Sequence, residues 1–454
     1  MQFICDFHIH SKYSRATAKD TDVENLAKWA KIKGVNVLGT GDFTHPLWLR
    51  ELKEKLEPAE LGLFQLKSKF QNSNYSKSNS NFKFQNNNHN EIKLILTTEI
   101  SSIYSKKGKT RKIHNIIFAP NFEAVEKINT HLGWIGNLKS DGRPILGLDA
   151  KELAKIVLDI SGDCLIIPAH AWTPWFSIFG SFSGFNSIEE CFEEYTKYIY
   201  SIETGLSSDP EMNWQLSALD NITLISNSDA HSPSKIGREA NVFEGEKIDY
   251  NLIAKAIKRR STQIEPRQVG DTQINAEKEL QLVKTLEFFP EEGKYHWDGH
   301  RNCEICLSPE ESLKYNNVCP RCGKPLTIGV MNRVHQLADR KLGEKPANAI
   351  PFQRLIPLNE IIADVLGVGV GTKGVEGYYK TLIRTFGSEF KILLEIKKEE
   401  IAAASLPEIA EGVERVRQGR VSVSPGYDGE FGKISIFGKE EERPKTVGGQ
   451  ETLF

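Results

Sequence analysis

Seven short apolar runs, rich in β-branched residues, are spread over the first half of the chain. They cover residues 3–10, 35–43, 93–100, 113–119, 164–170, 198–205 and 223–231. Stretches with the spacing of amphipathic helices lie between many of them, for example 22–34 and 150–162. Strands that alternate with helices indicate parallel βαβ units in an α/β fold. Seven strands in succession favour a closed barrel over an open sheet.

Histidines and carboxylates gather near the C-terminal ends of these runs. They are His8, His10, Asp42, His45, Glu99, His170, Glu203, Asp229 and His231. In a β/α barrel this end of the strands builds the active site. His8 and His10 are two residues apart, so their imidazoles project from the same face of a strand. His114 differs, because it stands at the start of its run.

Together with His114, this set holds more potential metal ligands than one ion needs. Mixed imidazole and carboxylate ligands suit Zn²⁺, Mn²⁺ or Fe²⁺. Two or three such ions would clamp the attacking and leaving oxygens of a phosphoester and generate a hydroxide at neutral pH. Glu99 is a candidate for a carboxylate that bridges two of them. The residues alone therefore predict metal-assisted phosphoester hydrolysis.

Two Cys-x-x-Cys pairs follow the predicted barrel. Cys303 and Cys306 form one pair, Cys319 and Cys322 the other, and twelve residues separate the pairs. Four thiolates on two short loops are typical of a tetrahedral zinc site. Four sulfurs leave no open position for a substrate, so we expect one structural zinc in a four-cysteine ribbon.

Composition along the chain predicts where its domains begin and end. We expect the barrel over 1–262, with a disordered Asn- and Ser-rich insertion at 71–90. Residues 263–330 are predicted to form a linker helix and the zinc ribbon. Residues 331–425 are predicted to form a small helical domain with a glycine-rich turn, and 426–454 a flexible tail.

Charge and hydropathy narrow the class of protein. The formal net charge of −2 over 454 residues gives no attraction of the whole protein to nucleic acid. No apolar run reaches the roughly 18 residues of a membrane span. The N-terminus lacks a charged leader followed by an apolar stretch, so we expect a cytoplasmic protein.

Six motifs in order carry a family resemblance: HIH (8–10), GTGDFTH (39–45), TTEI (97–100), KIHN (112–115), PAHAW (168–172) and SDAH (228–231). They resemble the PHP (polymerase and histidinol phosphatase) phosphoesterase superfamily. A PHP barrel joined to a zinc ribbon and a glycine-turn helical domain is similar to the endonuclease Q family. That family nicks DNA on the 5′ side of deaminated bases (uracil, hypoxanthine, xanthine) and abasic sites. The resemblance implies a distorted (β/α)7 barrel of the PHP type.

The resemblance also implies roles for single residues. His8, His10, Glu99 and Asp229 would hold one metal, and Glu99, His114 and His170 a second. Asp229 would be the most essential carboxylate, with Glu99 and His231 as further catalytic residues. A third metal would fall to Asp42, His45 and His231. The chain departs from the family pattern there, because Phe43 stands directly after Asp42. The ions would be Zn²⁺, Mn²⁺ or Mg²⁺, and Glu203 would support the site or contact substrate.

Three segments are candidates for DNA or lesion contacts within this resemblance. Aromatic residues past His170 would line a pocket for an extruded base, or else pack in the core: Trp172, Trp175, Phe176 and Phe179. A basic run would hold phosphates, or else form a solvated hairpin tip: Lys106, Lys107, Lys109, Arg111 and Lys112. The turn at 366–375 would bind a phosphate through Gly369, Gly371 and Lys373, or else only join two helices.

The last five residues, QETLF, have the form of a sliding-clamp-binding peptide with Gln450, Leu453 and Phe454 as anchors. The alternative is an ordinary polar tail. Extended tails with apolar anchors can dock in apolar grooves.

Two other functions compete with a lesion-specific DNA endonuclease. One is a small-molecule phosphatase of the histidinol phosphate type, and the other is a non-catalytic DNA-binding scaffold. The complete ligand set argues against a scaffold. A small ester needs neither a zinc ribbon nor a helical domain, whereas a damaged double- or single-stranded DNA needs contacts beyond the active site. We therefore expect a nucleoid-associated repair endonuclease.

Overall fold

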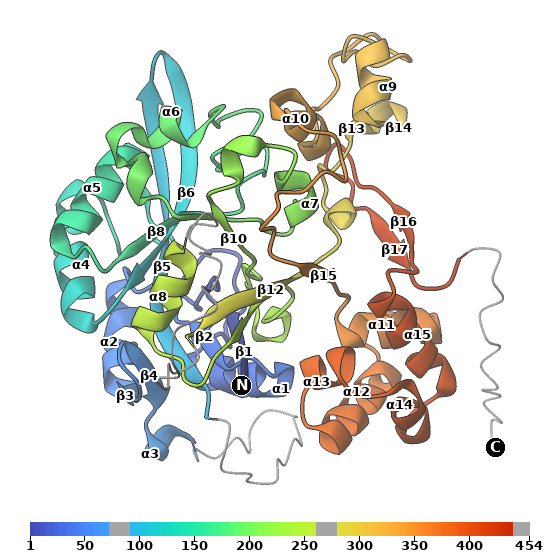
Figure 1. Cartoon of the computed structure of the whole chain (residues 1–454), viewed down its shortest axis with the longest axis horizontal. Coiled ribbons are helices and arrows are strands. Elements are labelled where there is room, and N and C mark those ends of the chain that lie inside the picture. The colour runs from blue at the N-terminus through green and yellow to red at the C-terminus, as the bar shows by residue number, and fades with distance from the viewer. Residues whose placement is uncertain (72–90, 260–278, 439–454) are drawn as a thin grey trace, which may run out of the picture.

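The computed structural model describes residues 1–71, 91–259 and 279–438, and the following account concerns these residues. Strands lie at the centre of the larger domain, with helices around them (Figure 1), and seven of these strands make a ring. They are β1 (Gln2–Asp6), β2 (Val37–Gly39), β5 (Lys93–Lys106), β6 (Lys109–Ala119), β8 (Leu165–Pro168), β9 (Ser201–Glu203) and β10 (Thr223–Ile225). Each falls within or overlaps one of the seven apolar runs, so the predicted α/β barrel is confirmed.

Hydrogen bonds close the ring. Strands β1, β2 and β5 pair in parallel, and β9 pairs in parallel with β10. The amide of Ala171 donates to the carbonyl of Glu203 at 2.9 Å, which joins the end of β8 to β9. A parallel bridge between Ile9 and Ala230 joins the end of β1 to the segment after β10.

Strand β6 is the exception to the parallel order. It pairs antiparallel with both β5 and β8. Lys107 and Gly108 form the tight turn before it, with φ of 52° and 74°. This hairpin rises above the barrel rim in Figure 1. Because β6 runs in reverse, its early residue His114 lies opposite Ser101 of β5, at the same end of the barrel as the other site residues.

The outer layer consists of helices whose apolar faces pack on the ring. They are α1 (Val23–Lys33), α2 (Pro46–Lys55), α4 (Phe122–Ile135), α5 (Ala150–Ile160) and α8 (Tyr250–Lys258). Helix α1 shows the local cause. The Asp22 carboxylate accepts the amide of Asn25 at 2.9 Å, Leu26 and Ala30 face the core, and Gly34 ends the helix at φ 89°.

Short elements complete this domain: β3 (Leu56–Pro58), β4 (Leu63–Leu66), α3 (Ser68–Gln71), β7 (Ile145–Leu146), α6 (Ile188–Phe192) and α7 (Pro210–Asn213). Three more strands extend the sheet beyond β1 in the order β11 (Ala240–Glu244), β12 (Gln281–Glu287) and β15 (Phe352–Arg354). The sheet of the barrel therefore takes strands from both sides of the boundary that we predicted at 262.

The C-terminal domain is helical, in line with the prediction. Its helices are α11 (Leu358–Leu366), α12 (Lys373–Phe386), α13 (Glu389–Leu394), α14 (Lys398–Ala404) and α15 (Pro407–Arg417). Ile361, Leu382 and Val413 meet in its core. The glycine-rich turn joins α11 to α12 and is exposed over residues 367–374.

The predicted flexible tail is wrong for its first part. A hairpin of β16 (Ser422–Ser424) and β17 (Lys433–Ser435) spans the predicted boundary. Ile436 and Phe437 are buried, and the amide of Ile436 donates to Asp364 at 2.9 Å. The QETLF motif, the last part of the tail and the insertion over 72–90 lie outside the described residues, as does the start of the predicted linker helix.

Polar contacts dock the helical domain on the barrel. The Lys33 ammonium lies 2.7 Å from a carboxylate oxygen of Glu389, and both side chains are only 5% exposed. Glu360 of α11 accepts hydrogen bonds from Lys235 and Arg238. At Gly34 a Cβ would lie 2.6 Å from the Ser388 hydroxyl, so glycine permits this close approach.

A Cys/His cluster lies within a small module between the two domains. The module contains β13 (Asp298–His300), β14 (Ile305–Leu307) and α9 (Pro309–Lys314), and α10 (Val330–Leu337) follows it. Ligand atoms of His300, Cys303, Cys319 and Cys322 lie within 4.8 Å of one another. Desolvation opposes ionisation of Cys319, but hydrogen bonds from the amides of Cys322 and Arg321 lower its pKa to about 6, which favours the thiolate that zinc binds.

This geometry corrects the predicted four-cysteine set. Cys306 pairs across the β13–β14 hairpin with Gly299 and lies outside the cluster, and His300 takes its place. The sequence held a signal for this, because His300-x-x-Cys303 has the same spacing as Cys303-x-x-Cys306. The set of three thiolates and one imidazole still fits a closed tetrahedral zinc site.

No helix in the described part of the chain is long and apolar enough to cross a bilayer.

Replacing Lys33 by Met should destabilise the protein by about 3 kcal/mol, because it leaves the Glu389 carboxylate buried without its cation. Urea unfolding monitored by tryptophan fluorescence measures this loss. Lys127→Met, on an exposed pair with Glu123, is the matched control and should leave the midpoint unchanged. Equal midpoints for the two variants would contradict the proposed docking contact.

His300→Ala and Cys319→Ser should each lower the zinc content of the purified protein by about one equivalent, since each removes one of four ligands. Cys306→Ser should retain that zinc. Elemental analysis after dialysis gives the counts. Loss of zinc from Cys306→Ser with retention in His300→Ala would restore the four-cysteine set.

Candidate active site

Four side chains meet at the open end of the barrel. The Nε2 atoms of His8 and His10 lie 3.6 and 3.3 Å from one oxygen of Glu99, and 3.6 and 3.0 Å from one oxygen of Asp229. The two histidines follow β1, Glu99 lies on β5 and Asp229 follows β10. The structure thus brings together the four residues expected for a first metal.

Carboxylates behind the two histidines set their orientation. Nδ1 of His8 lies 3.0 Å from Glu203, and Nδ1 of His10 lies 3.0 Å from Asp42. A proton on each Nδ1 donates to these carboxylates, so each Nε2 would offer its lone pair to a cation held beside Glu99 and Asp229. Glu203 therefore supports the site from behind and is fully buried.

Glu99 also belongs to a second group. Its other oxygen lies 2.7 Å from Nδ1 of His114 and 3.1 Å from Nε2 of His170. The outer nitrogens of these rings lie 3.1 Å from the hydroxyls of Ser101 and Thr173. The inner nitrogens of the two rings are only 3.1 Å apart. The Glu99 carboxylate thus lies between two ligand groups, as predicted for a bridge.

The charge of each histidine ring depends on the carboxylates beside it. Burial alone would lower the pKa of His8 and His10, but the carboxylates around them raise it well above the usual value. Burial lowers the pKa of His114 to about 4, so its ring is neutral at pH 7. Burial alone would raise the pKa of Asp229, but the imidazoles of His8 and His10 hold it well below its usual range. A divalent cation binds neutral imidazoles and ionised carboxylates, so it would take the place of the protons that His8 and His10 share with these carboxylates.

Three buried polar atoms in the first group lack a hydrogen-bond partner within the described residues: Nε2 of His8, Nε2 of His10 and one oxygen of Asp229. Buried polar atoms are nearly always satisfied, so unpaired ones that converge indicate a place where an ion binds. The donor set of both groups therefore fits divalent cations, and Glu99 would bridge them.

Backbone strain concentrates at the same place. Asp42, His170 and Asp229 adopt φ of 50°, 29° and 45°, a region that residues other than glycine rarely occupy. Each follows a strand of the ring and turns its side chain back over the barrel end. Such strain persists only where surrounding contacts enforce it, and it is common at functional sites.

The residues predicted to bind a third metal, Asp42, His45 and His231, do not form a cluster in the described part of the chain. Asp42 accepts hydrogen bonds from His10, from the amide and hydroxyl of Ser11 and from Ser14, so it orients a ligand. His45 stacks on Tyr13 at 4.4 Å instead. Among the described residues, these side chains join no third cluster with His231. A third metal on Asp42, His45 and His231 therefore stays a prediction, because the described residues do not bring these three side chains together.

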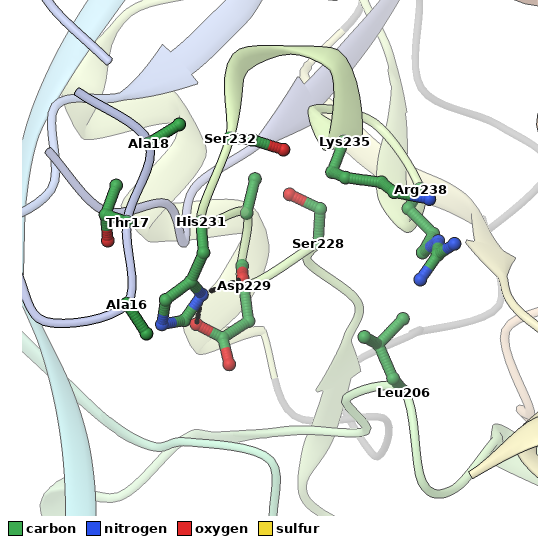
Figure 2. A pocket seen from close by; sticks show the side chains of 11 residues that line it. Ala16, Thr17, Ala18, Leu206, Ser228, Asp229, His231, Ser232, Lys235 and Arg238 are labelled. Carbon is green, nitrogen blue, oxygen red and sulfur yellow. Dashed lines mark hydrogen bonds and ion pairs between the residues drawn. The ribbon is translucent and has the colours of Figure 1, made fainter. Parts of the chain in front are cut away.

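His231 lines a pocket beside Asp229. The pocket encloses about 470 Å³, and Figure 2 shows Asp229 and His231 on one wall, Lys235 and Arg238 on another and Leu206 below. Nδ1 of His231 lies 2.8 Å from the carbonyl of Asp229. Burial lowers the pKa of His231, so this ring is also neutral at pH 7.

Arg143 is a site residue that no pattern in the sequence marked. Its Nη1 donates to Glu99 at 3.0 Å, and its side chain is 26% exposed. Arg143 lies in the loop between α4 and β7, away from the strand ends that the apolar runs marked. Only the folded loop brings it to Glu99.

The aromatic segment after His170 divides into two parts. Trp172 and Phe179 are buried in the core, so the prediction that they face a base is wrong. Trp175 stacks on Phe182 at 4.5 Å with an interplanar angle of 3°, and both are partly exposed. Phe176 packs against the second ligand group, 4.8 Å from His114.

The basic run also divides. Lys106 pairs with Asp149 and Glu193, and Arg111 binds the carbonyl of Gly184 and the Phe185 ring. These two side chains are therefore engaged within the protein and are not free to hold a phosphate. Lys107 and Lys109 at the hairpin tip are exposed, and Lys112 lies over Phe176.

Comparison with known proteins finds a family and relatives that are similar to this chain. Residues 357–420 match the family described as the MJ0043 C-terminal domain. The chain is 33% identical to the uncharacterized protein MJ0043 of Methanocaldococcus jannaschii over 274 residues, which are 59% of this chain. It spans 31% of the length of that relative.

Two crystal structures match over nearly the full length. The lesion-specific endonuclease PfuEndoQ from Pyrococcus furiosus has 31% sequence identity and a TM-score of 0.79, with 96% of each chain covered. An endonuclease Q in complex with a 27-mer duplex that carries an abasic lesion has 30% identity and a TM-score of 0.77, again with 96% of each chain covered. Shared sequence and shared architecture over this length confirm the resemblance of the motifs, and the chain belongs to the endonuclease Q family.

Proposed function

We propose that the protein is a metal-dependent DNA repair endonuclease that hydrolyses the phosphodiester on the 5′ side of abasic sites and of deaminated bases. The two ligand groups that share Glu99 support this most directly, because such a pair suits phosphodiester hydrolysis. A relative of the same family has been crystallised with duplex DNA that carries an abasic lesion. Uracil, hypoxanthine and xanthine are the deaminated bases that we expect it to accept.

The ligand groups would hold two divalent cations, Zn²⁺, Mn²⁺ or Mg²⁺. When bound, such cations make an attacking water more acidic and offset the charge of the phosphate. Asp229 holds its side chain between His8, His10 and the pocket, so it is placed to orient the water at the phosphate. A water oxygen then bonds to phosphorus as the bond from phosphorus to the sugar oxygen breaks, and that sugar oxygen takes up a proton from solvent to leave as a hydroxyl.

His231 is placed to accept the proton of that water. The N–H at Nδ1 donates to the Asp229 carbonyl, so the lone pair of Nε2 is free to accept a proton. The ring lies on the wall of the pocket in Figure 2. We assign it the part of general base.

Surfaces near the site supply the DNA contacts in this proposal. The stacked pair of Trp175 and Phe182 offers ring faces to unpaired bases. Lys107, Lys109 and Lys112 line the hairpin that borders the second ligand group, and they would contact phosphates. The exposed turn with Gly369, Gly371 and Lys373 would contact a more distant phosphate.

Two further proposals rest on the sequence alone. A sliding clamp would bind the C-terminal peptide through Gln450, Leu453 and Phe454. The protein would act at the nucleoid in the cytoplasm, where its substrate lies.

Asp229→Asn should abolish nicking of a labelled duplex with one deoxyuridine, deoxyinosine or abasic site, because it removes the charge that faces His8 and His10. The wild type should nick one bond 5′ to the lesion in the presence of Mn²⁺, Mg²⁺ or Zn²⁺ and not with EDTA. An undamaged duplex is the control substrate. Hydrolysis of a sugar phosphate without cleavage of any lesion duplex would instead favour a small-molecule phosphatase.

Trp175→Ala combined with Phe182→Ala should weaken binding of a lesion duplex by about tenfold or more, given the contribution of stacking to single-stranded binding. Fluorescence anisotropy with an EDTA-treated protein measures the affinity. Trp134→Ala removes an exposed aromatic ring on α4 and serves as the control. An equal effect of both changes would assign the stacked pair no special part in binding.

A further inference from the structure

Arg143 brings a permanent positive charge beside Glu99. Its Nη1 donates to the Glu99 oxygen that also faces His8 and His10. A guanidinium has five N–H donors in a planar fork, so this bond leaves most of them available. The side chain is 26% exposed beside Glu99, so it is accessible to a ligand from outside the protein.

The loop that carries Arg143 is held firmly. The amide of Gly142 donates to the carbonyl of Tyr13 at 3.0 Å, and the amide of Ser101 donates to the carbonyl of Pro144 at 3.1 Å. The hydroxyl of Thr44 donates to the Gly142 carbonyl. These bonds tie both neighbours of Arg143 to the barrel, so its position does not depend on a mobile loop.

Gly142 brings the loop unusually close to the site. A Cβ on this residue would lie 2.2 Å from a carboxylate oxygen of Asp42 and 2.4 Å from the Ser14 hydroxyl. No other residue type fits there without displacing the network that orients His10. Glycine at position 142 thus lets the loop approach Asp42 and Ser14, and the next residue is the cationic Arg143.

We propose that Arg143 contacts the scissile phosphate and stabilises the negative charge that develops on it during hydrolysis. The inference deepens the proposed endonuclease function and rests on it. Arginine binds phosphate oxygens in pairs, and stabilisation of developing charge is often the main source of an enzyme's rate enhancement. Arg143 forms no covalent bond and transfers no proton, because its guanidinium stays protonated.

The alternative is that Arg143 has a purely structural role and does not contact the phosphate. It would then only neutralise Glu99, whose pKa is held well below the usual range, despite burial, by the surrounding histidines and Arg143 itself. The two parts differ in one measurable way. A phosphate contact depends on the planar fork of arginine, whereas neutralisation of Glu99 needs only a positive charge nearby.

The test uses the full-length protein with Arg143→Gln, Arg143→Lys and the control Arg15→Gln. Arg15 pairs with Asp141 in the same loop, but its side chain is 76% exposed and does not reach Glu99. Three readouts are compared: bound metal by elemental analysis, affinity of the manganese-loaded protein for orthophosphate by calorimetry, and the single-turnover rate of nicking at a deoxyuridine.

We expect all variants to retain their metal. Arg143→Gln should lower the nicking rate by about 100-fold, as loss of one stabilising donor does elsewhere, and should weaken orthophosphate binding by about tenfold. Arg143→Lys should fall short of the wild type in both the nicking rate and the affinity for orthophosphate. Added guanidinium should recover part of the nicking rate of Arg143→Gln. Arg15→Gln should match the wild type in metal content and orthophosphate affinity.

Three results would overturn the inference. They are unchanged orthophosphate affinity in Arg143→Gln, full recovery of rate and affinity by Arg143→Lys, and loss of metal from Arg143→Gln that Arg143→Lys prevents. Failure of the wild type to nick any lesion duplex, with orthophosphate binding that still depends on Arg143, would refute the proposed function and leave the phosphate contact in place.

Discussion

The Glu99 carboxylate is the point on which the site depends. It is almost fully buried, and a bare carboxylate in such a place would be strongly destabilising. The fold offsets this cost by surrounding it with polar and charged groups from separate parts of the chain. Imidazoles approach both oxygens, and the guanidinium of Arg143 approaches one of them.

This constraint explains the second layer of carboxylates. Glu203 and Asp42 lie behind His8 and His10 and accept their Nδ1 protons, so each ring presents its other nitrogen to Glu99 and Asp229. Without them the rings could flip to the other tautomer and leave the centre without lone pairs. Asp42 also accepts hydrogen bonds from Ser11 and Ser14, so both of its oxygens have hydrogen-bond partners in this structure.

The two outer parts of the chain reach back to the same end of the barrel. Glu360 of the helical domain binds Lys235 and Arg238, which line the pocket beside Asp229. Arg333, just past the Cys/His module, donates to the carbonyls of Phe179 and Phe185 in the aromatic segment. Surfaces proposed to hold DNA are therefore joined to the segments that carry the proposed chemistry, which fits a substrate larger than the pocket.

Local sequence determined the seven strands, the ligand residues of both groups and the helical domain. The apolar runs and the histidines at their ends depend on short-range periodicity, which can be recognised in a single chain. The sequence also contained the His300-x-x-Cys303 spacing, although the neighbouring Cys-x-x-Cys pair concealed it.

Only the tertiary structure decided the rest, because it depends on which segments meet. The reversal of β6 placed His114 with Glu99, and strand direction is set by pairing partners rather than by composition. The choice of His300 over Cys306 and the split of the aromatic segment depend on which way each side chain faces. Arg143 reaches Glu99 through contacts of its loop with Tyr13, Thr44 and Ser101, and contacts so distant in sequence leave no mark on the loop itself.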